Sequence, residues 1–116
     1  MNQRKKPVIP GLQECMGNLQ KGDIDAFERS ARLLAQRHPQ AAKAQQLLGV
    51  AALMRGRLQE AVDQLQRAAR LDQTDATIWD NLGVALQRAG HHDAAVECYQ
   101  SSVRLDPNVP AVWCNA

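Results

Sequence analysis

The sequence contains an internal repeat, and this periodicity narrows the possible folds more than its composition does. Shifted by one period, residues 42–75 align with residues 76–109, and twelve of the 34 positions are identical. Two unrelated segments of ordinary composition would share roughly two identities. The identities form blocks, such as Leu48-Gly49-Val50-Ala51 over Leu82-Gly83-Val84-Ala85. A period of this length indicates a stack of identical supersecondary units.

The same period continues, in weaker form, toward both ends of the chain. Gly22 lies one period before Gly56, and Trp113 lies one period after Trp79. We therefore divide the chain by repeat. The division is a basic flexible tail at 1–7, a degenerate repeat at 8–41, clear repeats at 42–75 and 76–109, and the truncated start of a fourth at 110–116.

Each repeat is predicted to be a pair of helices. In the third repeat, Trp79, Leu82 and Leu86 recur at helical spacing. Gly90 follows as a helix end, because the left-handed conformation that ends many helices favours glycine. A second helix should run from about His92 to Leu105, with an apolar inner face formed by Ala95, Val96, Tyr99 and Val103. In the first repeat, Asp23 can cap the second helix.

The composition agrees with an all-α fold. Aromatic residues make up only 3% of the chain, while the helix formers Ala, Gln, Leu and Arg are abundant. Three hairpins and the start of a fourth give seven expected helices. Small residues recur in the column Cys15, Gly49 and Gly83, where we expect two helices to cross closely.

The charge and the cysteines of the chain limit which partners and which cellular compartment we expect. The tail carries Arg4, Lys5 and Lys6, which leaves 11 basic residues against 12 acidic ones in the rest of the chain. We expect a solvated tail and no nucleic-acid partner, with a targeting or nucleic-acid role of the tail as the alternative. The three cysteines follow no metal or disulfide pattern, and no signal peptide or membrane span is evident. The chain is therefore predicted to be cytoplasmic, without a membrane partner.

The residues capable of chemistry are not arranged for it. His91 and His92 are adjacent, and neighbouring helical residues point about 100° apart, which makes a poor metal chelate. The glycines fall at helix ends and crossings, not in a loop that could hold phosphate. We expect no catalytic residue, no metal and no cofactor, and we predict that the chain is not an enzyme.

The second and third repeats resemble the tetratricopeptide repeat family. Its pattern of Trp, Leu-Gly, Ala, an aromatic residue and a late Pro is matched by Trp79, Leu82-Gly83, Ala95, Tyr99 and Pro107. The second repeat has Gln45 in place of the tryptophan. The asparagine two residues after the tryptophan, Asn81 here, is similar to the asparagine ladder of O-linked N-acetylglucosamine transferase arrays. The repeats also look close to those of bacterial transferases that carry such arrays.

This resemblance implies a right-handed superhelical α-solenoid that binds a peptide or a partner helix in a concave groove. The groove would be lined by the first helix of each pair. The site residues expected on that basis are Leu47, Val50, Met54, Thr77, Asp80, Asn81, Val84, Gln87 and Arg88. Leu12, Met16, Leu19 and Leu53 are further candidates, unless they pack between helices instead. The alternative function is the N-terminal, substrate-recruiting array of a larger enzyme such as a glycosyl- or sulfotransferase.

The C-terminal end raises the question of self-association. Residues 110–116 offer Val112 and Trp113 to cover the third hairpin, but a helix this short is marginal in water unless it is packed. We expect the segment either to fold back on its own chain or to reach a second molecule, and the second option gives a dimer or an end-to-end array.

Overall fold

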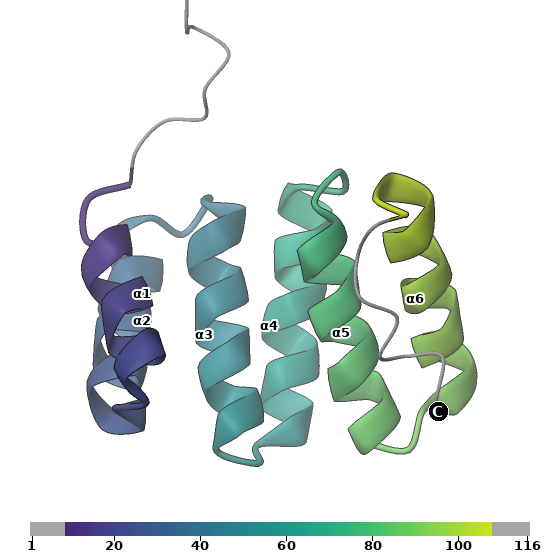
Figure 1. The fold of residues 1–116 in the computed structure, drawn as a ribbon, viewed down its shortest axis with the longest axis horizontal. Helices are drawn as coiled ribbons and strands as arrows, with labels where there is room; N and C mark the ends of the chain where they lie inside the picture. Colours follow the sequence, from purple (N-terminus) through teal and green to yellow (C-terminus); the bar gives the residue numbers. More distant parts are fainter. Residues whose placement is uncertain (1–8, 108–116) are drawn as a thin grey trace, which may run out of the picture.

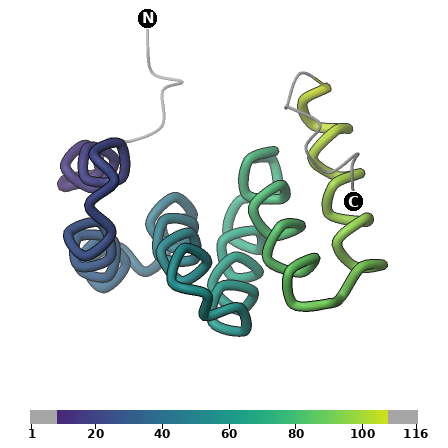
Figure 2. Tube along the Cα trace, turned by 60° about the horizontal axis from the view of Figure 1, so that its bottom comes forward, coloured from purple at the N-terminus to yellow at the C-terminus, as the bar shows by residue number. Residues whose placement is uncertain are grey.

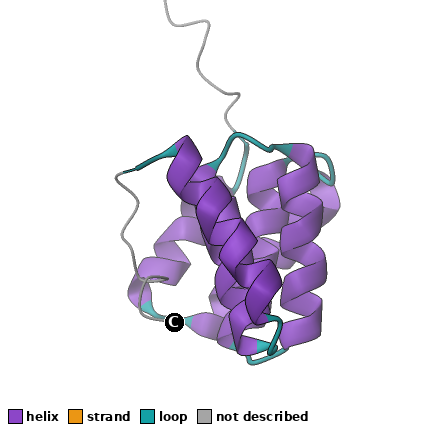
Figure 3. Cartoon of the chain, turned by 90° about the vertical axis from the view of Figure 1, so that its right-hand side faces the viewer, coloured by secondary structure: helices purple, strands orange, loops and turns teal. Residues whose placement is uncertain are grey.

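The computed structural model describes residues 9–107, which form six α-helices in three hairpins (Figure 1). The hairpins pair α1 (Leu12–Lys21) with α2 (Ile24–Arg37), α3 (Ala42–Met54) with α4 (Leu58–Leu71), and α5 (Ala76–Arg88) with α6 (His92–Leu105). Within residues 9–107 there are helices and loops but no strand (Figure 3). The all-α prediction is confirmed. The predicted basic tail (1–7) and the predicted seventh helix (110–116) lie outside the described residues.

The hairpins follow one another along an arc, with the first and the last hairpin at its two ends (Figure 2). Each helix packs mainly on the helices next to it in the sequence, and α3 also contacts α5 directly. Helices on the inside of a curved stack lie closer together than those on the outside, so this contact places α3 and α5 on the inner side. The arrangement is a helical solenoid in which α1, α3 and α5 are the first helices of successive units.

The turns within the hairpins depend on glycine and on one aspartate cap. Gly22 ends α1 with φ of 77°, and Gly90 precedes α6 with φ of 92°. A residue with a Cβ is strained in this left-handed region, which explains why glycine recurs there. Asp23 caps α2 as predicted, because its Oδ1 accepts a hydrogen bond of 3.1 Å from the Ala26 amide.

The predicted close crossings lie inside the second and third hairpins. A Cβ built on Gly49 would lie 2.6 Å from Leu65 Cγ, and one built on Gly83 would lie 2.5 Å from Tyr99 Cε1. Only glycine allows these side chains to lie against the facing backbone. The column of small residues therefore has a packing role.

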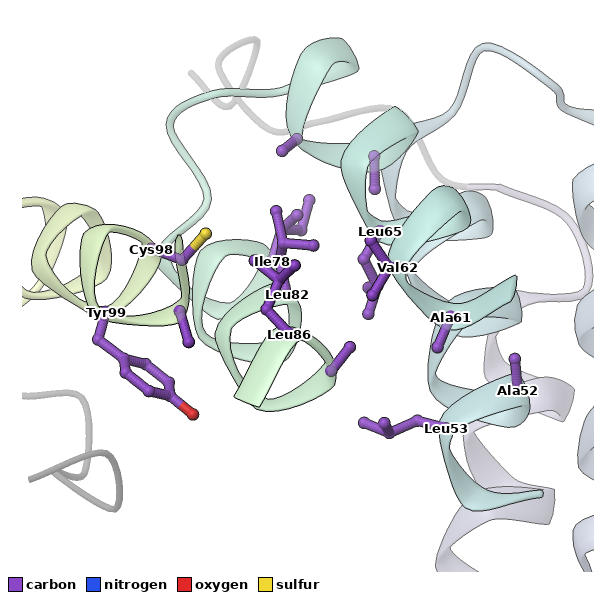
Figure 4. Close-up of a cluster of buried hydrophobic side chains, with 14 residues drawn as sticks. Ala52, Leu53, Ala61, Val62, Leu65, Ile78, Leu82, Leu86, Cys98 and Tyr99 are labelled. Carbon is purple, nitrogen blue, oxygen red and sulfur yellow. The ribbon is translucent and has the colours of Figure 1, made fainter. Parts of the chain in front are cut away.

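The core divides into two buried clusters. One lies between the first hairpin and α3, around Phe27 and Leu34. The other spans the second and third hairpins, where Val62 and Leu65 of α4 face Ile78 and Leu82 of α5 (Figure 4). Each hairpin thus buries its apolar face against its neighbours, as expected for a repeat array.

The first repeat fills the same space with a different set of residues. In the second and third repeats, the second helix carries a small residue and, four positions later, a large one: Ala61 with Leu65, and Ala95 with Tyr99. The first repeat reverses this order with Phe27 followed by Ala31, both fully buried. It also has Cys15, again fully buried, where the others have Gly49 and Gly83. A larger residue at the crossing, Cys15, thus goes together with a smaller residue at position 31.

The predicted inner face of α6 is only partly correct. Ala95 and Tyr99 are 2% and 3% exposed, but Val96 is 47% exposed. Its equivalent one repeat earlier, Val62, is 5% exposed because α5 covers α4. The pattern of α6 is therefore that of a covered helix, but no described helix covers Val96.

Candidate binding surface

The nine residues predicted to contact a ligand come from two neighbouring helices on the inner side of the arc. Leu47, Val50 and Met54 lie on α3, and the other six lie on α5. The two helices contact each other, and we call the face that carries these residues, except the buried Leu47, the inner surface. Met16 of α1 occupies the repeat position of Val50 and Val84.

A hydrogen-bonded glutamine joins α3 to α5 on this face. Gln46 Nε2 donates to Thr77 Oγ1 at 3.1 Å and to Asn81 Oδ1 at 2.8 Å. Gln46 is only 5% exposed, and the sequence prediction missed it. A signal was available, because Gln46 lies one period before Asp80, which was predicted. Leu47, which was predicted instead, is 4% exposed and packs in the core of the first two hairpins.

The polar residues of α5 differ in the hydrogen bonds that they already make within the chain. Thr77 Oγ1 donates to Asp75 Oδ1 at 2.6 Å in the cap of α5, besides accepting from Gln46. Gln87 Oε1 accepts a hydrogen bond of 2.8 Å from the Tyr99 hydroxyl, and burial raises the pKa of Tyr99. Arg88 is exposed. Asn81 Oδ1 already accepts a hydrogen bond from Gln46, so the side-chain NH2 group of Asn81 can donate two hydrogen bonds to a ligand.

Gln46 and Asp80, which share one repeat position, each carry a buried side-chain oxygen without a hydrogen-bond partner, and that of Asp80 belongs to a carboxyl group. Burial raises the pKa of this carboxyl group. A buried acceptor without a partner costs free energy, so such groups are uncommon in folded proteins. Asp80 is therefore suited to receive a hydrogen-bond donor.

The apolar part of the inner surface is a column with one residue from each first helix. Met16 is 36% exposed, while Val50 and Val84 are half-buried. Met54, at 39% exposed, lies beside the column. Leu53, a further candidate, is 9% exposed and packs between helices. Accessible methionine and valine side chains at one repeat spacing form a surface that can adapt to an apolar partner segment.

Two clefts of the described surface lie away from these residues. One, of about 620 Å³, opens beside the loops that precede α3 and α5 and includes His38, Lys43 and Asp75 in its wall. Another, of about 370 Å³, lies on the outer side of the array and includes Trp79, Leu82 and Cys98. None of the nine predicted residues lines either cleft.

The residues considered for chemistry are exposed helix-end residues or buried thiols. His91 and His92 are exposed at the start of α6. Cys15 and Cys98 are buried, and burial raises the pKa of both thiols, that of Cys98 to about 11. A protonated, buried thiol is a poor nucleophile. Within residues 9–107, no three His, Cys, Asp or Glu side chains come together as a metal site would require. The described helices include none with the length and apolar character needed to span a membrane.

Comparison with known proteins bears on the repeats directly. A model described as TPR repeat matches residues 51–90, and a model described as tetratricopeptide repeat matches residues 76–109. No protein with a curated description matches the chain.

Solved structures share the fold. The crystal structure of MamA is 28% identical with a TM-score of 0.77, over 84% of this chain and 57% of that one. A mutant of the Thermobaculum terrenum O-GlcNAc transferase is also 28% identical, with a TM-score of 0.81, over 84% of this chain and 19% of that one. This chain thus spans little more than half of the first protein and about a fifth of the second. With two repeat models that together match residues 51–109, and the same helical hairpins as these structures, the chain belongs to the tetratricopeptide repeat family.

Proposed function

We propose that this chain is a protein-interaction module whose inner surface binds a segment of a partner protein, as a peptide or as a helix. The observation that carries the proposal is the column of Met16, Val50 and Val84, which places one accessible apolar side chain on each first helix. Apolar residues exposed in a line can bury area against one continuous ligand, whereas scattered ones cannot.

The polar residues beside the column specify the chemistry of the ligand. The Asn81 amide can donate to a backbone carbonyl, and the exposed Arg88 guanidinium favours a carboxylate. The ligand we expect is an apolar segment with an acidic residue toward the α5 end. Met54 and Gln87 contribute contact area, and Leu47 contributes only as support beneath Val50.

A selection from a displayed library of random peptides, with the purified chain as bait, tests this proposal. Binders should lose at least about tenfold in affinity toward Val50→Glu and Val84→Glu, since a buried charge opposite an apolar segment costs more than about 1.4 kcal/mol. Gln66→Glu, an exposed change on the outer side of α4, is the matched control and should leave binding unchanged. Chemical-shift changes centred on Glu97 and Gln100 of α6 would instead place the binding site on the outer face.

The likeness to part of the O-GlcNAc transferase favours a second candidate, an array that recruits protein substrates for an enzyme. In that setting the inner surface has the same task, and only its partner changes. A longer chain with transferase activity would then modify intact protein substrates more slowly when it carries Val84→Glu, with no change toward a short acceptor peptide. Equal effects on both acceptors would contradict recruitment by this surface.

A further inference from the structure

The cleft on the outer side of the array lies between the second and third hairpins. Leu82 and Leu86 of α5 lie at its base between α4 and α6, and Cys98 of α6 lies in its wall (Figure 4). Its volume of about 370 Å³ is large enough for a binding site. We call it the outer cleft. None of the nine residues predicted to contact a ligand lines it, so it is separate from the inner surface.

The apolar residues of the outer cleft distinguish the third repeat from the second. At three positions the second repeat has a polar residue where the cleft has an apolar one: Gln45 for Trp79, Glu60 for Ala94, and Gln64 for Cys98. The second hairpin forms the same pair of helices with these polar residues. The helical hairpin therefore does not require the apolar ones, and their gathering in one cleft indicates a surface that a partner covers.

The tryptophan and the thiol both present apolar surface to the cleft. Trp79 is half-buried, and its Nε1 donates a hydrogen bond of 2.9 Å to the Gln73 carbonyl, which leaves the indole ring for apolar contact. Cys98 is buried, and this burial raises the pKa of its thiol to about 11, so the thiol is uncharged at neutral pH. An indole ring beside an uncharged thiol suits an apolar side chain, and aromatic rings pack favourably on indole.

Two charges of opposite sign lie at the rim of the outer cleft. Arg70 of α4 and Glu97 of α6 are both exposed, and neither forms an ion pair or a hydrogen bond with another described residue. α4 and α6 run in the same direction, because each packs antiparallel to α5. Glu97 is the repeat equivalent of Asp63, which precedes Arg70 by seven residues. Two helical turns, about 10 Å, therefore separate the acidic end of the cleft from its basic end.

We propose that the outer cleft is a second protein-binding site, which takes a segment that carries an aromatic or large aliphatic residue between an acidic residue and a basic one. The apolar side chain packs on Trp79, the acidic residue pairs with Arg70, and the basic residue pairs with Glu97. A polypeptide can meet both ends, because three extended residues or two helical turns span about 10 Å. The inner surface and the outer cleft are separate, so the chain can hold two partners at the same time.

A displayed library of random peptides, selected on the wild-type chain, tests the proposal. Clones that still bind Val84→Glu do not use the inner surface, and they should lose their binding to Ala94→Trp, which fills the outer cleft. If no selected clone is independent of Val84→Glu, the outer-cleft proposal fails while the function proposed for the inner surface stands. Independent clones that bind Ala94→Trp normally would also overturn it. A wild-type dimer that Ala94→Trp dissociates would instead assign the cleft to a second copy of this chain.

Reversal of the rim charges gives a readout that a misfolded variant cannot imitate. Arg70→Glu makes both ends of the cleft acidic and should shift the preference toward clones with two basic residues. Glu97→Arg makes both ends basic and should favour clones with two acidic residues. Each exchange should change the relative affinity about fivefold, the upper range for exposed ion pairs. Arg67→Glu, an exposed change on α4 outside the cleft, is the control and should leave the preference unchanged. Clones whose charge preference does not follow the two reversals would overturn the proposal.

Discussion

The two described contacts between successive hairpins are made with different chemistry at the same repeat position. Between the first and second hairpins, the position is held by Glu28, which accepts hydrogen bonds from Arg55 at 2.9 Å and Arg57 at 2.6 Å. Arg55 also pairs with Asp25. Between the second and third hairpins, the position is held by Val62, which is 5% exposed against α5. The partners differ accordingly, because Ala89 and His91 stand where Arg55 and Arg57 do one repeat earlier.

This difference shows that a repeat position fixes a place in the fold but not the kind of interaction made there. The side chains of Arg55 and Arg57 are 31% and 48% exposed, and ion pairs that water can screen stabilise only modestly. Val62 is removed from water, and burying its side chain contributes more. At this repeat position, the Val62 contact should therefore contribute more to stability than the Glu28 contact, and it should be insensitive to pH and salt.

The largest expected effect is on the apolar contact. Val62→Ala should lower the free energy of unfolding by about 2 kcal/mol, because two buried methyl groups are removed and a cavity remains. Val96→Ala makes the same chemical change at the equivalent exposed position, and should change stability by less than about 0.5 kcal/mol. Urea denaturation of the two variants measures the difference. Equal losses would contradict the assignment of Val96 as an exposed position.

A smaller effect is expected when the ionic contact loses its charge. The guanidinium groups of Arg57 and Arg55 lower the pKa of Glu28 to about 2. This pKa lies below the ordinary value of 4.5, so the contribution is complete above about pH 5 and is lost as the pH falls toward 2. Glu28→Gln should cost up to about 1 kcal/mol at pH 7.

Unfolding measured from pH 7 to pH 2 tests this expectation. The wild type and Glu28→Gln should differ at neutral pH and converge at the acidic end. Asp63→Asn, which neutralises an exposed carboxylate on α4, is the matched control and should differ little from the wild type throughout. A gap between wild type and Glu28→Gln that persists at pH 2 would show that Glu28 stabilises by packing rather than by charge.

The smallest expected effect is that of salt. At 1 M NaCl the screening length is about 3 Å, which weakens exposed ion pairs. The stability difference between the wild type and Glu28→Gln should shrink by a few tenths of a kcal/mol, whereas the difference caused by Val62→Ala should stay constant. Melting curves in low and high salt provide the measurement, and a salt-sensitive Val62 variant would contradict the assigned apolar contact.

The helices could be predicted from the sequence because their signals are local. Apolar spacing, Gly90 and the late Pro107 were enough to give α6 its observed bounds. The facing of single residues could not be predicted in the same way, because it depends on how each helix is rotated against its neighbour. Gln46 and Leu47 are adjacent and point about 100° apart, so Gln46 bonds to Thr77 and Asn81 of α5 while Leu47, which was predicted to contact a ligand, packs in the core of the first two hairpins. Likewise Val96 has the sequence of a buried residue, and only the absence of a described covering helix exposes it.

The reversed order of Phe27 and Ala31 has a consequence for anyone who wishes to recombine these hairpins. The three hairpins cannot be exchanged for one another, because the interior of the first depends on a different combination of buried residues, Cys15, Phe27 and Ala31. Ala31→Leu alone, which copies Leu65 of the second hairpin, would crowd Cys15. Phe27→Ala alone would leave a cavity. A longer array built by duplication should copy the second or third unit and keep the first as its fixed beginning.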